Sequence, residues 1–144
     1  MPRMNLEGSS SIVTGGASGI GEASARQLAA AGSKVVIADL NEERGTQIAE
    51  EIGGVFVKCD VTNTEDADAA VAAACELGPL RACVNSAGIG LPGRTVDRNN
   101  QPLDLEGFSI VVKINLIGTF NVLSRAAAAM AQTEPLDEDG SRGA

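Results

Sequence analysis

A glycine-rich turn, Thr14-Gly15-Gly16-Ala17-Ser18-Gly19-Ile20-Gly21, lies between a short strand predicted over 9–13 and a helix predicted over 21–31. A strand that turns sharply into a helix directs backbone N–H groups and the positive helix end at one spot, which suits a diphosphate. In such a turn Gly15 permits the tight bend, Gly19 lets a pyrophosphate approach the backbone, and Gly21 lets the helix pack closely against the strand. A turn with a purely structural role is the alternative interpretation.

The next strand candidate, Lys34-Val35-Val36-Ile37-Ala38-Asp39, ends in an acid that is followed by Leu40. In a dinucleotide-binding βαβ unit, a carboxylate roughly 20 residues after the glycines accepts hydrogen bonds from the adenosine ribose hydroxyls. Asp39 stands at this position, although it could instead be a solvated aspartate that caps the next helix. A carboxylate repels a 2′-phosphate, and no Arg or Lys lies within the turn or directly after Asp39. NAD is therefore favoured over NADP.

Strands and helices alternate along the rest of the first half of the chain. Further strands are predicted over 55–59 and 80–84, and further helices over 42–52, capped by Asn41, and 65–77, capped by Asn63 or Thr64. Strands separated by helices cannot pair as hairpins, so we expect a parallel sheet with right-handed crossovers. The glycine turn, Asp39, Asp60-Val61 and the segment 85–88 each follow a strand. They should gather at the carboxyl edge, where ligands bind in such sheets.

Two longer segments follow. Residues 89–105 form a polar loop with Pro and Gly, which predicts either a functional lid or a disordered insertion. Its Arg94 and Arg98 could meet an anionic substrate group, but two solvated arginines are the favoured interpretation. A long helix is predicted over 106–131, with Asn115 inside it, and the polar segment 132–144 has no regular period. The helix carries an apolar face formed by Phe108, Val111, Val112, Leu116, Phe120 and Leu123.

The composition limits which folds, partners and kinds of site are compatible with the chain. The 144 residues are expected to form one domain with a Val, Ile, Leu and Ala interior, since three Phe are the only aromatic residues. A net charge of −8 argues against nucleic acid and anionic membrane surfaces as partners. The apolar runs are short, so we expect no membrane span or signal peptide and a cytoplasmic location. The chain has no His, and Cys59, Cys75 and Cys83 lack metal-ligand spacing, so buried free thiols are predicted and a metal site is not.

Five motifs in this order resemble the short-chain dehydrogenase/reductase family over essentially the whole chain. They are the turn at 14–21, Asp39, Asp60-Val61, Asn-x-Ala-Gly at 85–88, and Asn115 within Ile114-Asn115-Leu116. Within the family, Gly118-Thr119-Phe120-Asn121-Val122 with Met130 and Glu134-Pro135 looks most like the type 2 short-chain 3-hydroxyacyl-CoA dehydrogenases that also act on hydroxysteroids. The resemblance implies a Rossmann-type doubly wound α/β fold, of which this chain forms the four-strand portion with the order 3-2-1-4.

The resemblance also implies an NAD-dependent oxidoreductase that moves a hydride between nicotinamide and a small-molecule secondary alcohol or ketone. The family works as a homo-oligomer, a dimer or tetramer, which forms through the long helix. Asn115 corresponds to the family's helix Asn, which positions a water in the proton relay. The implied cofactor-binding residues are Gly15, Ser18, Gly19, Ile20 and Gly21 for the phosphates and ribose, Asp39 and Leu40 for the adenosine ribose, Asp60 and Val61 for the adenine, and Asn85, Ser86, Ala87 and Gly88 for the nicotinamide side.

The family's chemistry depends on a Ser followed by Tyr-x-x-x-Lys, and this chain contains no Tyr. We therefore expect residues 1–144 to be the amino-terminal part of a longer enzyme and to be inactive alone. A non-catalytic NAD-binding or interaction protein is the second hypothesis. A nucleotide-fold methyltransferase is disfavoured by the segment 85–88 and by the gap between Gly15 and Gly19. A P-loop is excluded because Glu22 stands where a phosphate-binding Lys is needed.

Overall fold

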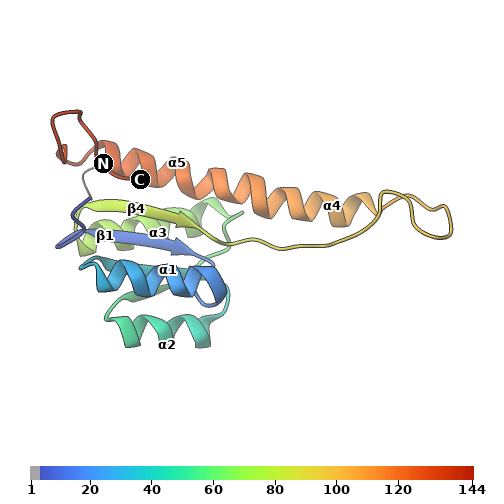
Figure 1. Cartoon of the computed structure of the whole chain (residues 1–144), viewed down its shortest axis with the longest axis horizontal. Coiled ribbons are helices and arrows are strands. Elements are labelled where there is room, and N and C mark those ends of the chain that lie inside the picture. Colours follow the sequence, from blue (N-terminus) through green and yellow to red (C-terminus); the bar gives the residue numbers. More distant parts are fainter. Residues whose placement is uncertain (1–3) are drawn as a thin grey trace.

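Four parallel strands form the centre of the structure, a computed structural model in which residues 4–144 are described. The strands are β1 (Ser10–Thr14), β2 (Lys34–Asp39), β3 (Val55–Lys58) and β4 (Leu80–Asn85), in the order β3-β2-β1-β4. All neighbouring pairs are parallel, with Val13 opposite both Ile37 and Val84. The predicted Rossmann-type sheet and its strand order are confirmed (Figure 1).

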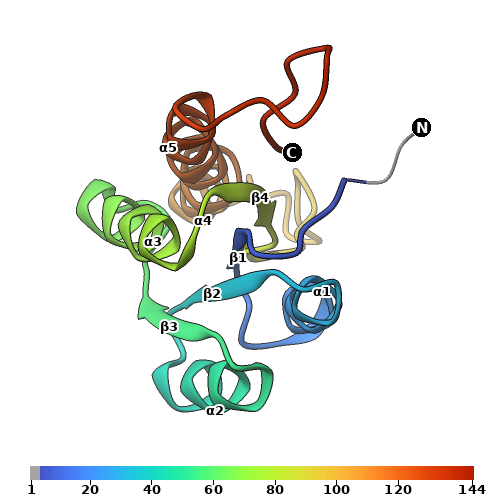
Figure 2. The same cartoon turned by 90° about the vertical axis from the view of Figure 1, so that its left-hand side faces the viewer.

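Helices cover both faces of this sheet (Figure 2). α1 (Gly19–Ala30) and α2 (Glu42–Ile52) pack on one face, while α3 (Thr64–Leu77) and α5 (Thr119–Ala131) pack on the other. Because successive strand residues point to opposite faces, the apolar side chains divide into two cores. Ile12 and Val36 are fully buried toward α3 and α5, whereas Val13 and Ile37 are fully buried toward α1 and α2.

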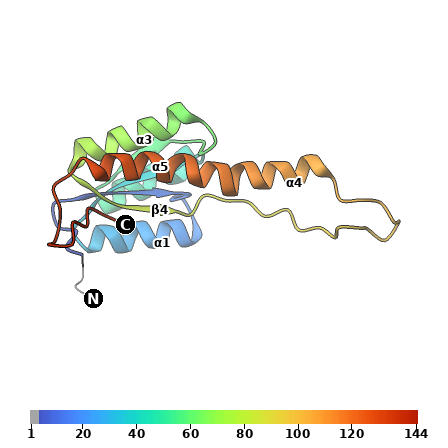
Figure 3. The ribbon, with the colours of Figure 1, turned by 90° about the horizontal axis from the view of Figure 1, so that it is seen from above.

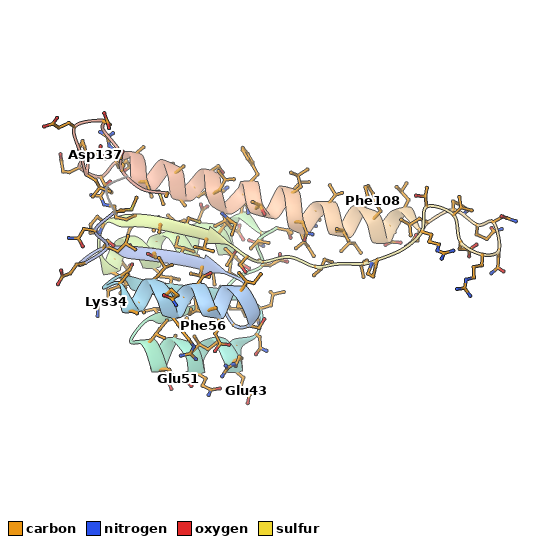
Figure 4. The ribbon with its side chains drawn as sticks, viewed as in Figure 1. Lys34, Glu43, Glu51, Phe56, Phe108 and Asp137 are labelled. Atoms are coloured by element: carbon orange, nitrogen blue, oxygen red, sulfur yellow. The ribbon has the colours of Figure 1, made fainter. Side chains whose placement is uncertain are left out.

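Phe56 of β3 extends the second core toward α2 (Figure 4). Gly45 of α2 faces the Phe56 ring, and a Cβ at this position would collide with it. Glu43 and Glu51 lie on the exposed side of the same helix. The absence of a side chain at position 45 therefore lets α2 lie directly on the aromatic ring.

Asparagine side chains cap two of these helices, as the sequence predicts. Asn41 Oδ1 accepts a hydrogen bond of 3.1 Å from a first-turn N–H of α2. Asn63 Oδ1 accepts two such bonds, of 2.8 and 3.0 Å, at the start of α3, so Asn63 rather than Thr64 is the cap. Gly53 ends α2 with a φ of 65°, a left-handed conformation that suits glycine.

The predicted long helix is one continuous helical stretch, Leu105–Ala131, with three parts. These are α4 (Leu105–Val112), a π-helical segment η1 (Lys113–Gly118) and α5. The buried side of the stretch consists of Gly118, Val122, Ala126 and Met130, which are spaced four residues apart. A Cβ on Gly118 would lie 2.5 Å from a methyl carbon of Val61, so the small residue permits the close approach.

Most of the residues predicted to form an apolar face of this helix do not pack against the sheet. Phe108, Leu116, Phe120 and Leu123 are exposed, and Val111 and Val112 are half-buried. The helix is apolar on two sides, and the side with the smaller residues fits against α3 and β4. Phe108 lies on α4 beyond the end of the sheet (Figure 4).

Length and hydropathy also qualify the expectation that no stretch could cross a membrane. Leu105–Ala131 contains 27 residues with a mean hydropathy of 1.4 over its most apolar window, of which 11% is buried. By length and composition alone this helix is able to span a bilayer, and the expectation of no membrane span stays a prediction. One such helix is weak grounds for a membrane protein, because a helix that packs against protein passes the same test.

Residues 89–104, which we call the arm, extend beyond the carboxyl ends of the strands beside α4 (Figures 1 and 3). The tip of the arm is a hairpin, with Val96 bridged to Pro102 in antiparallel fashion. Asp97 Oδ1 accepts hydrogen bonds from two backbone N–H groups of the turn, at 2.7 and 2.9 Å, and Asn100 adopts a left-handed φ of 59°. Of the two predicted alternatives, a disordered insertion is not what the structure shows. Every residue of the arm is exposed.

The last residues lie against the free edge of β4. The buried Arg81 donates hydrogen bonds to Thr133 Oγ1 at 2.6 Å and to the carbonyl oxygen of Arg142 at 2.7 Å. The N–H of Ala144 donates to the Arg81 carbonyl, and the Cys83 N–H donates to the Ala144 carbonyl, both at 2.8 Å. These two bonds have the pattern of a parallel strand pair. The polar tail is thus partly attached to the sheet.

Candidate functional site

A cavity of about 600 Å³ opens at the carboxyl ends of the strands. Its walls come from the loops that follow all four strands and from the first part of the long helix. The volume lies in the range of small-molecule and cofactor sites. Every predicted site residue lines this cavity except Gly21, Asn85 and Asn115.

The glycine turn forms one wall. Gly15 and Gly19 have φ angles of 63° and 52°, left-handed conformations that only glycine adopts readily. A Cβ on Gly15 would lie 2.7 Å from the Ala87 backbone nitrogen, whereas a Cβ on Gly19 would meet no atom within 4 Å. The space in front of Gly19 is therefore open to a ligand. Gly21 has a different partner from the predicted one, since a Cβ there would collide with the Gly15 carbonyl of the turn rather than with the strand.

The start of α1 faces the same space. Ser18 is the N-cap by position, but its side chain makes no capping hydrogen bond. Ile20 is 80% exposed and lines the cavity. The first N–H groups of a helix have no partners within the helix, and they carry the positive end of its dipole. This end of the cavity is therefore suited to an anion such as a pyrophosphate.

Asp39 lies beside this turn at the end of β2. Its Oδ2 accepts a hydrogen bond of 3.0 Å from the Ala17 N–H, and its Oδ1 accepts one of 2.9 Å from the Asn41 N–H. The alternative that Asp39 caps the next helix does not hold, because Asn41 occupies the cap of α2. A carboxylate has about four acceptor positions, so two are free to accept hydrogen bonds from a ligand. Leu40, which is 63% exposed, completes this corner.

Asp60 and Val61 form the wall that follows β3. Asp60 Oδ1 accepts hydrogen bonds from the N–H and Oγ1 of Thr62, at 2.9 and 2.8 Å. This fixes the turn and leaves the second carboxylate oxygen free of these contacts. Val61 is buried and contacts the long helix at Gly118. The two residues therefore offer one polar and one apolar group to the same end of the cavity.

The cysteines differ from one another in exposure. Cys59 lines the cavity, and its burial, reinforced by Asp66, Asp60 and Asp39, raises the pKa of the thiol to about 11. Burial also raises the pKa of Cys83 to about 11. Cys75 is exposed on α3, so the prediction of three buried thiols is wrong for this residue.

Thr14 joins the first and fourth loops. Its Oγ1 accepts hydrogen bonds of 3.1 Å from the N–H groups of both Ser86 and Ala87. This interaction holds the segment 86–88 against the glycine turn, where the missing side chain of Gly15 leaves room for it. Two walls of the cavity are thus connected through one hydroxyl group.

Asn85 does not line the cavity. Its Nδ2 lies 3.6 Å from Cys83 Sγ, and its buried Oδ1 has no hydrogen-bond partner among the described residues 4–144. The structure therefore places Asn85 outside the cavity lining, and its predicted contact with a cofactor stays a prediction.

Asn115 lies in the π-helical segment and holds the base of the arm. Its Oδ1 accepts a hydrogen bond of 2.9 Å from the Ile89 N–H, and its Nδ2 donates one of 2.8 Å to the Ile89 carbonyl. Both polar atoms of the amide are therefore engaged by one backbone unit. In this arrangement the Asn115 side chain fixes the backbone of Ile89. The predicted role in holding a water for a proton relay stays a prediction.

Several lining residues were absent from the prediction. They are Ala38, Cys59, Thr62 and Ile89 next to predicted positions, and Ile110, Lys113 and Ile114 on the long helix. The helix residues carry no local signal, because their position depends on where the helix crosses the sheet edge. Within residues 4–144, no group of three or more His, Cys, Asp and Glu side chains is placed to hold a metal ion.

Comparison with known proteins identifies the family. The family model described as short chain dehydrogenase matches residues 10–140. A 3-hydroxyacyl-CoA dehydrogenase type-2 from Drosophila melanogaster is 44% identical over 137 residues, which cover 92% of this chain and 53% of the relative. A 3-beta-hydroxysteroid dehydrogenase from Comamonas testosteroni is 40% identical over 131 residues, which cover 89% of this chain and 50% of the relative.

A solved structure agrees with these relatives. The crystal structure of 3-hydroxyacyl-CoA dehydrogenase type-2 from Mycobacterium avium matches with a TM-score of 0.91 and 44% identity, over 96% of this chain and 56% of that chain. The chain thus spans about half the length of the relatives it matches, and the predicted resemblance is confirmed. A family match that runs through all four strands, on a backbone shared with a solved member, shows that this chain belongs to the short-chain dehydrogenase family.

Proposed function

We propose that this chain is the cofactor-binding part of an NAD-dependent oxidoreductase that transfers a hydride between nicotinamide and a secondary alcohol or ketone. One observation carries the proposal. The open start of α1 and the Asp39 carboxylate lie on one wall of the cavity, joined by the bond from the Ala17 N–H. This pair offers donors for a pyrophosphate and acceptors for ribose hydroxyls at adjacent places.

The residues of the cavity fit a dinucleotide. The helix start and the open space at Gly19 would receive the pyrophosphate, and Asp39 would accept hydrogen bonds from the adenosine ribose. Asp60 and Val61 would contact the adenine. The segment 86–88, held in place by Thr14, would line the nicotinamide half. When bound, the nicotinamide supplies the hydride donor or acceptor, while the protein fixes its position.

The charge of Asp39 supports NAD rather than NADP. A 2′-phosphate would approach the same carboxylate that accepts hydrogen bonds from the ribose hydroxyls, and like charges repel. Among the cavity-lining residues described, Lys113 is the one cation, and it comes from the helix wall rather than from the loop after β2.

Calorimetric titration of the Asp39→Asn variant with NAD and NADP tests this proposal. Asparagine retains one of the two side-chain oxygens, which can still accept from the Ala17 N–H, and loses the charge and the bond to the Asn41 N–H. The preference for NAD should narrow by about fivefold, the equivalent of ~1 kcal/mol for a partly exposed charge pair. Asp68→Asn, which removes an exposed carboxylate on α3 outside the cavity, is the matched control. Unchanged discrimination in Asp39→Asn would refute the role of Asp39. The absence of NAD binding to the unmodified chain would refute the proposed function.

For the whole enzyme we propose a 3-hydroxyacyl-CoA or a hydroxysteroid as substrate. The support is that relatives sharing 40–44% identity with this chain are named for these two substrate classes. The arginines of the arm, Arg94 and Arg98, are exposed and form no ion pair with a described acidic side chain.

A second candidate function applies to the 144 residues alone. Since they contain no Tyr, we propose that the chain binds NAD without turning over a substrate. NADH formation from a 3-hydroxyacyl-CoA by a preparation of verified length would contradict this.

We further propose that the protein associates with copies of itself through the long helix. Its exposed apolar side chains include Leu105, Phe108, Leu116, Phe120 and Leu123. Large exposed apolar patches are typical of interaction sites.

A further inference from the structure

An ion pair joins the first turns of α1 and α2. One terminal nitrogen of Arg44 lies 2.8 and 3.0 Å from the two carboxylate oxygens of Glu22. Arg26 donates to the same carboxylate at 2.8 and 3.0 Å. Hydrogen bonds from Arg26 and Arg44 hold the pKa of Glu22 below its ordinary value, so the carboxylate is ionised at neutral pH.

Both ends of this pair lie next to the proposed nucleotide site. Glu22 directly follows Gly21 of the glycine turn. Arg44 lies in the first turn of α2, where its N–H bonds to Asn41 Oδ1, and the Asn41 N–H in turn bonds to Asp39 Oδ1. Two hydrogen bonds therefore connect the Asp39 carboxylate to the backbone of Arg44.

Both terminal nitrogens of the Arg44 guanidinium have partners within the protein. One terminal nitrogen contacts Glu22, and the other donates to Gln47 Oε1 at 2.9 Å. A guanidinium is the side-chain group best suited to bind a phosphate, because its fork of donors matches two phosphate oxygens. A guanidinium released from Glu22 would therefore be available to a phosphate from the first turn of α2, the helix that follows Asp39.

We propose that Glu22 is a specificity-determining positioning residue, which excludes NADP by keeping the Arg44 guanidinium from a 2′-phosphate at the Asp39 corner. This inference rests on the proposed function of the cavity. The preference for NAD over NADP then has two causes. The Asp39 carboxylate repels the 2′-phosphate, and Glu22 binds the Arg44 guanidinium, which could otherwise offset that repulsion.

A purely structural ion pair would behave differently. Its loss would lower stability, and the removed charge would favour the more anionic NADP whether or not Arg44 is present. The ratio of the NAD and NADP dissociation constants cancels effects on the part that the two cofactors share, and the double variant separates the direct effect of charge on the 2′-phosphate from the effect of Arg44.

The test is calorimetric titration of the whole chain with NAD and with NADP. Glu22→Gln should shift the ratio of dissociation constants toward NADP by about two- to fivefold, the range expected for an exposed charge pair. Glu51→Gln is the matched control, since Glu51 contacts Arg26 at 2.6 Å and has no hydrogen bond with Arg44. Arg44→Ala alone should leave the ratio unchanged, and Arg44→Ala added to Glu22→Gln should abolish the shift.

The outcomes separate the two levels of inference. If the unmodified chain binds neither cofactor, the proposed function fails and this inference fails with it. If the chain binds NAD but Glu22→Gln leaves the ratio unchanged, or the shift persists in the double variant, the role of Glu22 is refuted while the proposed function stands. Circular dichroism of each variant verifies that the fold is retained.

Discussion

Alanine substitutions at two glycines can distinguish the loss of the proposed pyrophosphate contact from the cost of backbone strain. Gly19 and Gly53 have similar left-handed φ angles, of 52° and 65°, and a Cβ at either position would meet no atom within 4 Å. Alanine should therefore cost about the same at both positions, roughly 1–2 kcal/mol for a left-handed residue. Thermal denaturation followed by circular dichroism should show similar losses, of roughly 3–8 °C.

Only Gly19 lies at the cavity. The methyl group of Gly19→Ala would occupy the open space where the pyrophosphate is proposed to approach the backbone, so NAD affinity should fall more than about tenfold, or ~1.4 kcal/mol. Gly53→Ala should bind NAD like the unmodified chain. Calorimetric titration measures both, and equal NAD affinity of the two variants would refute the placement of the pyrophosphate at Gly19.

Three further outcomes are expected. Asn115→Ala should release the backbone of Ile89 and make the arm more sensitive to limited proteolysis, a change that an unaltered cleavage pattern would contradict. Cys75 should react with an alkylating reagent in the native protein at pH 8, whereas Cys59 should react only after unfolding. Folding raises the pKa of Cys59 from 9.0 to about 11, so the contribution of this protonated thiol to the free energy of unfolding is complete below pH 9 and is lost as pH rises toward 11. Denaturant titration across this pH range would detect the loss. Phe120→Glu should weaken self-association in analytical ultracentrifugation, and an unchanged sedimentation profile would exclude the outer side of the long helix as the interface.

Much of the fold follows from local signals in the sequence. β-branched runs place the strands, and Asn41 and Asn63 cap helices with their own side chains. The loops after the strands gather at one edge because parallel strands share a direction, so the sequence alone assigns Asp39 and Asp60 to one site.

The features that sequence could not predict depend on contacts between distant residues. The amide of Asn115 bonds to a backbone unit 26 residues earlier, and Arg44 bonds to a carboxylate 22 residues earlier. Helical periodicity identifies apolar faces of the long helix but not which one meets the sheet. Val122 is buried and Phe120 exposed because the close approach to α3 and β4 favours the smaller residues.

The bond between Asn115 and Ile89 closes the arm at its base, and this has a consequence for how the protein can change. Because hydrogen bonds fix the base of the arm, motion of its tip is transmitted only weakly to the rest of the structure. The length of the arm matters little to stability, since each doubling of a flexible loop adds only about 0.6 kcal/mol of closure entropy. The arm can therefore gain or lose residues, and with them its reach and charge, while the cavity at its root keeps its shape.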